Sequence, residues 1–246
     1  MAELTTHHIA KQFDGKTIIE DVNITLHEHE IVCILGMSGV GKTTLFNIIS
    51  GLVRPDEGGV FLDGIDITGE TGKISYMLQK DLLLPYRTME DNVALPLLIR
   101  GEKKKQAREK VRLHFGKFGL EGTERQYPHQ LSGGMRQRAA LLRTYLFSQS
   151  VALLDEPFSA LDTITKAAMH RWYLKVMEEI QLSTLFITHD IDEAILLSDR
   201  IYLLTGQPGS ITDEIMIRES KPRAIDFNLT EDFLQYKKNI IKKLGM

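Results

Sequence analysis

Hydrophobic and polar residues alternate in short stretches over the first 70 residues of the chain. Two turn-forming pairs, Asp14-Gly15 and Asp63-Gly64, separate these stretches. A period of two between such turns is typical of half-buried strands that are joined as hairpins. The pattern therefore predicts antiparallel β-structure near the N-terminus, formed by the stretches HHIAKQF, KTIIEDVNITL and GVFLDGIDIT.

A second kind of stretch is almost wholly apolar and occurs at 31–35 and three times beyond residue 150. The later three are VALLD at 151–155, TLFITH at 184–189 and RIYLL at 200–204, with helical patterns between them. Apolar strands that alternate with helices are typical of a parallel sheet whose two faces are both covered. We therefore expect an α/β core with a mostly parallel sheet.

The interval from about residue 86 to residue 149 lacks such strand patterns and favours helices. We interpret 86–149 as a helical subdomain inserted into an α/β core that comprises 1–85 and 150–246, all within a single domain of 246 residues. The tail at 228–244 has apolar residues near helical spacing, which predicts a terminal amphipathic helix packed on the core. These apolar residues are Phe233, Ile240 and Leu244.

Composition narrows the class of protein. With 43% hydrophobic and 26% charged residues the chain resembles a soluble globular protein, and no apolar run approaches the roughly 20 residues of a membrane-spanning helix. The start lacks a signal-peptide core and the one cysteine, Cys33, lies in an apolar run, so we expect a packed thiol in the reducing cytoplasm. The formal charge of −3 gives no reason to expect nucleic acid as a partner, and we interpret Lys103 to Lys105 as a solvated face.

The sequence GMSGVGKT at 36–43 matches the P-loop template and lies between an apolar strand pattern and a helical one, as that template requires. Backbone N–H groups of such a loop surround a β-phosphate, and Lys42 adds a charge shared by the β- and γ-phosphates. We expect Thr43 to bind Mg²⁺ and Thr44 to reach the α-phosphate; the alternative is a structural glycine turn. The expected nucleotide-binding residues here are Gly36, Ser38, Gly39, Val40, Gly41, Lys42, Thr43 and Thr44.

Two carboxylates follow the apolar stretch VALLD, at its last residue Asp155 and at Glu156. Carboxylates at strand ends of α/β proteins lie at the ligand crevice, where Asp155 is placed to hold Mg²⁺. Glu156 would face the γ-phosphate and act as the general base for the attacking water. The alternative for two carboxylates before Pro157 is a solvated turn.

Two further polar residues follow apolar stretches, Gln79 after ISYML and His189 after TLFIT. If the strand ends converge, Gln79 would sense Mg²⁺ and water and His189 would contact the γ-phosphate; each is otherwise a hydrogen-bonded cap. Phe13 is an aromatic candidate for stacking on adenine, with a core position as the alternative.

A second anion-binding helix N-terminus is predicted at LSGGMRQR, where Ser132, Gly133 and Gly134 precede a helical pattern. One nucleotide needs only one such cradle, so a second one in the same chain requires a different explanation.

Together these motifs resemble the ATP-binding subunits of ATP-binding-cassette (ABC) transporters over about residues 3 to 215. They are GMSGVGKT (Walker A), Gln79 (Q-loop), LSGGMRQR (signature), VALLDE (Walker B), SALD at 159–162 ending in Asp162 (D-loop) and His189 (switch histidine), in the family's order. Phe13 falls where this family places its adenine-stacking aromatic, which is usually Tyr.

The resemblance implies an ATPase with ATP and Mg²⁺ as cofactors and with Lys42, Gln79, Glu156 and His189 as catalytic residues. Gln79 joins Thr43 and Asp155 at the metal. The resemblance also implies a head-to-tail dimer with a second copy or a paralogous subunit. The residues of one chain that would bind the partner's nucleotide are Ser132, Gly133, Gly134 and Asp162.

Within this family LLLPYRTMEDNV, Met135 and GQPGSI look like the nitrate, sulfonate and taurine importer group. That implies a subunit on the cytoplasmic face of the inner membrane, peripheral, which works with permease subunits and indirectly with a solute-binding protein. We expect Leu83, Leu84 and Tyr86 to line the permease-docking groove. The alternatives are a soluble single-cassette ATPase in assembly, repair or translation, an export or extraction system, and an unrelated P-loop kinase or GTPase.

Overall fold

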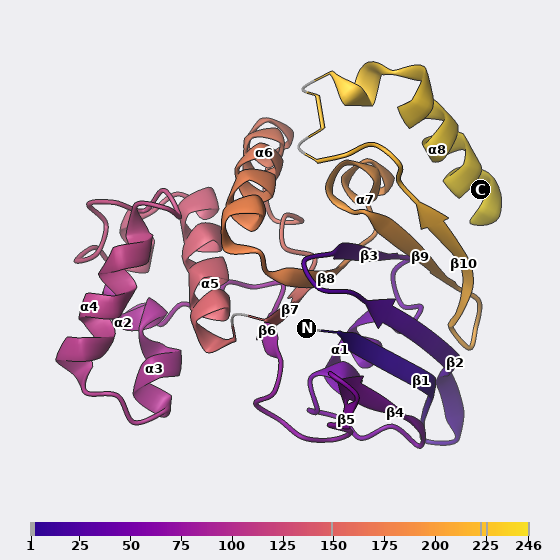
Figure 1. The fold of residues 1–246 in the computed structure, drawn as a ribbon, viewed down its shortest axis with the longest axis horizontal. Helices are drawn as coiled ribbons and strands as arrows, with labels where there is room; N and C mark the ends of the chain where they lie inside the picture. The colour runs from indigo at the N-terminus through magenta and orange to yellow at the C-terminus, as the bar shows by residue number, and fades with distance from the viewer. Residues whose placement is uncertain (1–2, 149, 222, 225, 246) are drawn as a thin grey trace.

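The protein is described here as a computed structural model that covers residues 3–148, 150–221, 223–224 and 226–245. Figure 1 shows two β-sheets stacked near each other and a group of helices set to one side of them. The fold is α/β, with an antiparallel N-terminal sheet, a mostly parallel second sheet and inserted helices, as the sequence predicts.

The N-terminal sheet is antiparallel throughout, with strand order β2-β1-β4-β5. Both predicted turns are present: Asp14 and Gly15 have φ angles of 50° and 76°, and Asp63 and Gly64 have φ angles of 53° and 76°. Two consecutive left-handed residues are typical of the tight turns that match the twist of a hairpin. The strands are β1 (Leu4–Phe13), β2 (Lys16–Leu26), β4 (Glu57–Leu62) and β5 (Ile65–Asp66).

The second sheet has the order β10-β9-β3-β8-β7-β6, in which all neighbours are parallel except β10 and β9. All of the predicted apolar stretches are strands of this sheet. Strand β10 was not predicted from the sequence. The strands are β3 (Ile31–Leu35), β6 (Ser75–Met77), β7 (Val151–Asp155), β8 (Ser183–Thr188), β9 (Arg200–Thr205) and β10 (Ser210–Met216).

The parallel sheet is buried on both faces. Along β3, Val32 and Ile34 face a core shared with the antiparallel sheet and α1 (Lys42–Ile49), whereas Cys33 and Leu35 face a second core that includes the inserted helices. Cys33 is fully buried, and burial raises the pKa of its thiol. The expectation that Cys33 is a packed hydrophobe is therefore confirmed.

Between 86 and 148 all of the described helices and strands are helices, joined by turns and loops, and no strand occurs there. The expected helix at the start of this interval is divided at Ala94, which ends one short helix and precedes Pro96 in the next. Lys103, Lys104 and Lys105 are exposed, as predicted. The helices of this interval are α2 (Met89–Val93), α3 (Leu95–Ile99), α4 (Lys104–Phe115), the short 3-10 helix Pro128–Gln130 and α5 (Gly133–Phe147).

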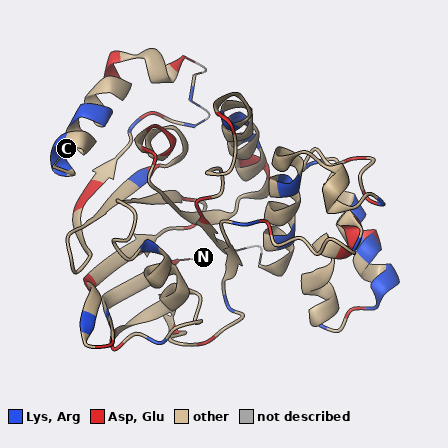
Figure 2. Cartoon of the chain, turned by 180° about the vertical axis from the view of Figure 1, so that it is seen from behind, with Lys and Arg blue, Asp and Glu red and all other residues tan. Residues whose placement is uncertain are grey.

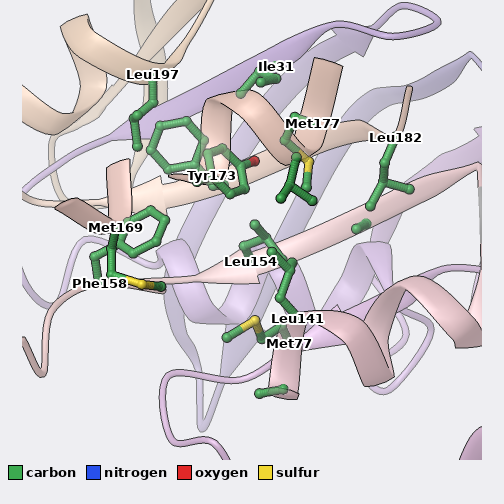
Figure 3. Close-up of a cluster of buried hydrophobic side chains, with 14 of the residues drawn as sticks. Ile31, Met77, Leu141, Leu154, Phe158, Met169, Tyr173, Met177, Leu182 and Leu197 are labelled. Carbon is green, nitrogen blue, oxygen red and sulfur yellow. The ribbon is translucent and has the colours of Figure 1, made fainter. Parts of the chain in front are cut away.

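Helix α6 (Thr163–Ile180) packs on the parallel sheet through its apolar face. Figure 3 shows Met169, Tyr173 and Met177 of α6 gathered with Leu154 of β7 and Ile31 of β3. This contact fixes α6 as a rigid neighbour of the strands that end at the candidate site.

The chain ends in α7 (Ile191–Leu197), the short 3-10 helix Phe227–Leu229 and α8 (Glu231–Lys243). Figure 1 shows α8 outermost, beyond α7. The predicted apolar residues of α8 face inward, because Phe233 and Ile240 are buried and Leu244 packs against the same core. The prediction of a terminal amphipathic helix on the core is confirmed.

A charged clamp holds α4 to α2. Figure 2 shows Lys and Arg prominent on α4, the outer helix of the inserted group. Arg108 donates two hydrogen bonds to Asp91, from Nε to Oδ1 at 2.7 Å and from NH2 to Oδ2 at 2.8 Å, and Asp91 is only 8% exposed. The Arg108 guanidinium holds the pKa of the Asp91 carboxyl below its usual value.

We expect Asp91→Asn to lower the free energy of unfolding at pH 7 by about 1.5–3 kcal/mol, because a charge-assisted pair is lost. A depressed carboxyl pKa stabilises the fold above the unfolded pKa and is lost as pH falls through the folded pKa, so the difference from wild type should shrink on acidification. Urea denaturation at pH 7 and below pH 4 measures the difference in the free energy of unfolding between the variant and wild type. Asp14→Asn, in an exposed turn, is the control; equal losses in both variants would contradict the clamp.

Candidate functional site

The P-loop, Gln79, Asp155, Glu156 and His189 lie where neighbouring parallel strands end. Residues 36–43 follow β3, Gln79 follows β6, Asp155 is the last residue of β7 with Glu156 next to it, and His189 follows β8. Parallel strands end at the same edge of a sheet, where α/β proteins bind ligands. The sheet therefore brings together residues that are far apart in the sequence.

The P-loop is wedged between neighbouring strands. A Cβ atom on Gly36 would lie 2.4 Å from the carbonyl oxygen of Leu204, and one on Gly41 would lie 2.5 Å from Ile19 Cγ2. Gly41 also has a φ of 108°, which favours glycine. Ser38, Gly39 and Thr43 are exposed, Val40 is buried and Thr44 is half-buried.

The N-terminus of α1 suits an anion. Its N-cap is Gly41, which has no side chain to accept from the first N–H groups, and no acidic residue lies in the first turn. Lys42 Nζ donates to the carbonyl oxygens of Gly36 at 2.8 Å and Met37 at 2.9 Å, inside the loop. Burial lowers the pKa of Lys42, and the carboxylates of Glu156 and Asp155 oppose that effect. Exposed N–H groups and a central ammonium fit a polyphosphate.

Asp155 is the centre of an oxygen-rich cluster. Its Oδ2 accepts from Thr43 Oγ1 at 3.4 Å and from the Tyr76 hydroxyl at 3.3 Å, and the residue is 7% exposed. Burial raises the pKa of Asp155. Mg²⁺ prefers one or two protein oxygens with the rest from phosphates and water, which this pair provides. Among the described residues no group of three or more His, Cys, Asp or Glu is placed to hold a metal.

Glu156 is held between two polar side chains. His189 Nδ1 lies 3.0 Å from Glu156 Oε1, and Gln79 Nε2 lies 3.2 Å from Glu156 Oε2 and 3.2 Å from Ser159 Oγ. Glu156 has a φ of 43°, and its N–H donates to the Ile187 carbonyl at 3.0 Å. A non-glycine residue in the left-handed region is strained and persists where the surroundings fix it. The fold thus fixes where this carboxylate points.

Gln79, Glu156 and His189 line a cavity of about 670 Å³ that also has Gly133 and Arg136 on its wall. Gln79 lies with Glu156 in this structure, and no hydrogen bond joins it to Thr43 or Asp155 among the described residues. Its expected place beside the metal therefore stays a prediction.

The signature residues and the D-loop aspartate both cap helices. Ser132 Oγ accepts from the Met135 N–H at 3.3 Å at the start of α5, with Gly133 and Gly134 in the first turn. Asp162 Oδ1 accepts from the N–H groups of Ile164 and Thr165, each at 3.1 Å, at the start of α6. None of the P-loop residues lines the cavity that Gly133 shares with Glu156. Their roles toward a partner's nucleotide stay predictions.

Phe13 lies at the end of β1 and is 45% exposed, so the alternative of a core position is wrong. Lys11 Nζ lies 5.3 Å from the centre of its ring. A ring with an open face is available for stacking, and the adenine role stays a prediction.

Two residues of the site were missed in the sequence. Tyr76 binds Asp155, and Ser159 binds both Gln79 and the Glu156 carbonyl. The signal for Tyr76 was a hydroxyl inside an otherwise apolar strand pattern, and Ser159 opens the SALD motif.

The family model and the similar proteins of known name all indicate the same family. Residues 19–159 match the ABC transporter family model. The formylaminopyrimidine import ATP-binding protein ThiZ of Halalkalibacterium halodurans is 44% identical over 226 residues, 92% of this chain and 87% of ThiZ. The taurine import ATP-binding protein TauB of Escherichia coli K12 is 40% identical over 212 residues, 86% of this chain and 83% of TauB.

Solved structures of an ABC transporter cassette share the fold of this chain. The dimeric structure of MJ0796, a bacterial ABC transporter cassette, superimposes with a TM-score of 0.74 at 29% identity and covers 88% of this chain and 100% of that one. A post-hydrolysis dimer of the same cassette, bound to ADP and Pi, superimposes with a TM-score of 0.73 at 29% identity and covers the same shares.

Proposed function

The chain belongs to the ABC transporter ATP-binding family and is an ATP hydrolase, and from this premise we propose that it powers import of a small solute through separate permease subunits. Hydrolysis is supported by Glu156, fixed by its own backbone and held between His189 and Gln79 at the sheet edge beside the P-loop, and import is supported by the import proteins ThiZ and TauB among the relatives. A chain that only bound nucleotide would not need a carboxylate fixed in this position.

In the proposed mechanism Lys42 and the N–H groups at the start of α1 bind the β- and γ-phosphates. Thr43 and Asp155 would hold Mg²⁺, which would supply positive charge beside the phosphates. Glu156 accepts a proton from the attacking water, and His189 orients the carboxylate and faces the γ-phosphate. General-base assistance of this kind contributes roughly 10²–10⁴-fold to the rate.

We also propose that the working unit is a head-to-tail dimer with a second copy or with a paralogous subunit. Ser132 is exposed and the α5 N-terminus offers N–H groups at Gly133 and Gly134, which would bind the γ-phosphate held by the partner's P-loop. The dimeric form of the similar cassette MJ0796 supports this arrangement.

A permease-docking groove is supported by an apolar cavity of about 400 Å³ bordered by the end of α1, β6, α3 and α5. Leu52, Leu82 and Ile99 line it and are 61%, 52% and 80% exposed. We propose that a segment of the permease binds here. In this setting exposed apolar side chains beside a cavity are typical of an interaction site.

The expected groove residues were partly wrong. Leu83 is buried in the core, and the main chain of Leu84 is held by the Asn92 side chain through its N–H at 2.6 Å and its carbonyl at 3.1 Å. Tyr86 is 72% exposed and is not among the residues that line the groove. Only the burial of Leu83 contradicts the expectation, and we propose that its neighbour Leu82 takes part in docking in its place.

We expect Ile99→Glu to reduce solute uptake by about tenfold or more, because the contact then requires a carboxylate to be removed from water. ATP hydrolysis by the isolated chain should stay within about twofold of wild type. Uptake is measured in vesicles that contain this chain together with its permease subunits. Leu229→Glu, at an exposed leucine on the 3-10 helix Phe227–Leu229, is the matched control.

If Ile99→Glu lowered uptake and isolated ATPase activity equally, the groove would be a packing feature and not a docking site. If no solute were taken up while ATP was hydrolysed, the alternatives of an export system or a soluble assembly ATPase would replace import. The first solutes to test are formylaminopyrimidine and taurine, which the names of the relatives give.

We propose a peripheral position on the cytoplasmic face of the inner membrane, with the solute chosen by a binding protein and the permease. None of the described helices is both long and apolar enough to cross a membrane. Attachment would therefore come through the docking groove.

A further inference from the structure

A buried hydrogen-bonded network lies directly behind the switch histidine. Thr188, which ends β8 and precedes His189, donates from Oγ1 to Glu193 Oε2 on α7. The other carboxylate oxygen of Glu193 lies 3.1 Å from His170 Nε2 on α6. Thr188 and Glu193 are each 2% exposed and His170 is 8% exposed. Both oxygens of a buried carboxylate therefore have partners.

The same network fixes the residue on the other side of His189. The Asp190 N–H donates to Thr188 Oγ1 at 3.1 Å, and Asp190 Oδ1 accepts from the Glu193 N–H at 3.1 Å. Lys166 Nζ donates to Asp190 Oδ2 at 2.9 Å. Burial alone would raise the pKa of Asp190, but the Lys166 ammonium and the hydrogen bond from the Glu193 N–H together hold that pKa below its usual value. The main chain is thus tied down on both sides of His189.

One face of α6 supplies both Lys166, which binds Asp190, and His170, which contacts Glu193. Lys166 and His170 are four residues apart and lie on the same side of the helix, and Asp162, its N-cap, is four residues earlier still. Tyr173 and Met177 of α6 are packed into the core (Figure 3). Helix α7 has only seven residues, so its orientation depends on the elements packed against it, of which α6 is one.

We propose that Thr188, Glu193 and His170 are positioning residues for hydrolysis, which hold His189 where its Nδ1 meets Glu156 without touching the nucleotide. This inference rests on the proposed function, because it assigns the three residues to the same hydrolytic site. A buried ion or hydrogen-bond network is a poor source of stability compared with apolar packing. Because the network binds the residues on both sides of His189, it can fix the position of the His189 side chain.

The first test compares Thr188→Val with Thr188→Ser. Valine keeps the shape of threonine and removes the hydroxyl, whereas serine keeps the hydroxyl and loses the methyl group. We expect Thr188→Val to lower kcat by about 10- to 100-fold, the scale of a misplacement of about 1 Å, with KM for ATP changed less than twofold. Thr188→Ser should retain most of the wild-type kcat. Equal kcat values in the two variants would overturn the proposal.

The same substitution in a chain that lacks His189 separates a positioning role from a general loss of structure. In a His189→Ala chain there is no imidazole to place, so adding Thr188→Val should lower the residual rate no further. The rate is followed as single-turnover release of radiolabelled phosphate over hours. A further loss of the same size in this background would show a purely structural role and overturn the proposal. A wild-type chain without ATP hydrolysis would instead overturn the proposed function itself.

The hydrogen bond between His170 of α6 and Glu193 is tested by a matched pair of substitutions at His170. His170→Leu removes the hydrogen bond to Glu193 and keeps an apolar side chain beside Phe158, whose ring centre is 5.0 Å from that of His170. His170→Gln offers an amide N–H near the former Nε2 position. We expect kcat to fall with leucine and to recover with glutamine. The same kcat for both would overturn the role assigned to His170.

Discussion

The Glu156→Gln variant should bind ATP as tightly as wild type and hydrolyse it at least about 10²-fold more slowly. Glutamine keeps the shape of the side chain and one acceptor oxygen toward Gln79 or His189, but it cannot take a proton from water. Bound ATP should therefore persist, and with it the ATP-dependent dimer.

Two measurements check this expectation. Phosphate release gives the turnover, and gel filtration in MgATP gives the lifetime of the dimer, which should exceed that of wild type. The exposed Glu121→Gln substitution is the control for loss of a carboxylate and should change neither. Turnover by Glu156→Gln near the wild-type rate would remove Glu156 from the role of base.

The strands of the parallel sheet were predictable because the sheet is covered on both faces. Val32 and Ile34 pack on one side and Cys33 and Leu35 on the other, so β3 is apolar at every position. Strand β10 pairs on one side only, and most of its residues are exposed or half-buried, which leaves no continuous apolar stretch. Its residues look like a loop in the sequence for the same reason.

The site was predictable where it depends on strand ends and glycines. The P-loop is recognised by Gly36 and Gly41, whose missing Cβ atoms the neighbouring strands require. The sequence did not show that Gln79 turns toward Glu156, because that depends on the conformation of one side chain at a cavity wall. In the connector after Gln79, tertiary packing buries Leu83 and exposes Leu82, a difference of one residue that no periodicity encodes.

The network behind His189 could not be predicted from the sequence for a different reason. Thr188 and Glu193 are close in the chain, but their partner His170 is 23 residues from Glu193 and lies on another helix. Each residue alone has an ordinary local explanation: a strand end, a helix position and a buried histidine. Only the packing of α6 against α7 brings them into hydrogen-bond distance.

Mixed dimers of Lys42→Ala and Ser132→Arg chains should occlude MgATP at one of their two sites, although neither variant alone should do so. Lys42→Ala removes the ammonium that a bound triphosphate needs, and Ser132→Arg places a bulky side chain at the exposed N-terminus of α5. If each site joins a P-loop from one chain to a signature loop from the other, one site of the mixed dimer receives both lesions. The second site then receives neither.

The substitutions must leave both chains folded for this comparison. Loss of the Ser132 cap should cost about 1 kcal/mol, and loss of the two Lys42 hydrogen bonds about 1–3 kcal/mol, so thermal unfolding of each variant is measured first. Two different affinity tags then isolate the mixed dimer from either parent.

A single turnover is the decisive measurement, because steady turnover would stop if both sites had to act together. The isolated mixed dimer should retain labelled MgATP and release one phosphate per intact site, whereas each parent should stay at the background. Retention no greater than that of the parents would contradict the shared site. Ser132, Gly133 and Gly134 would then have only the role that the single chain shows, as the cap and first turn of α5.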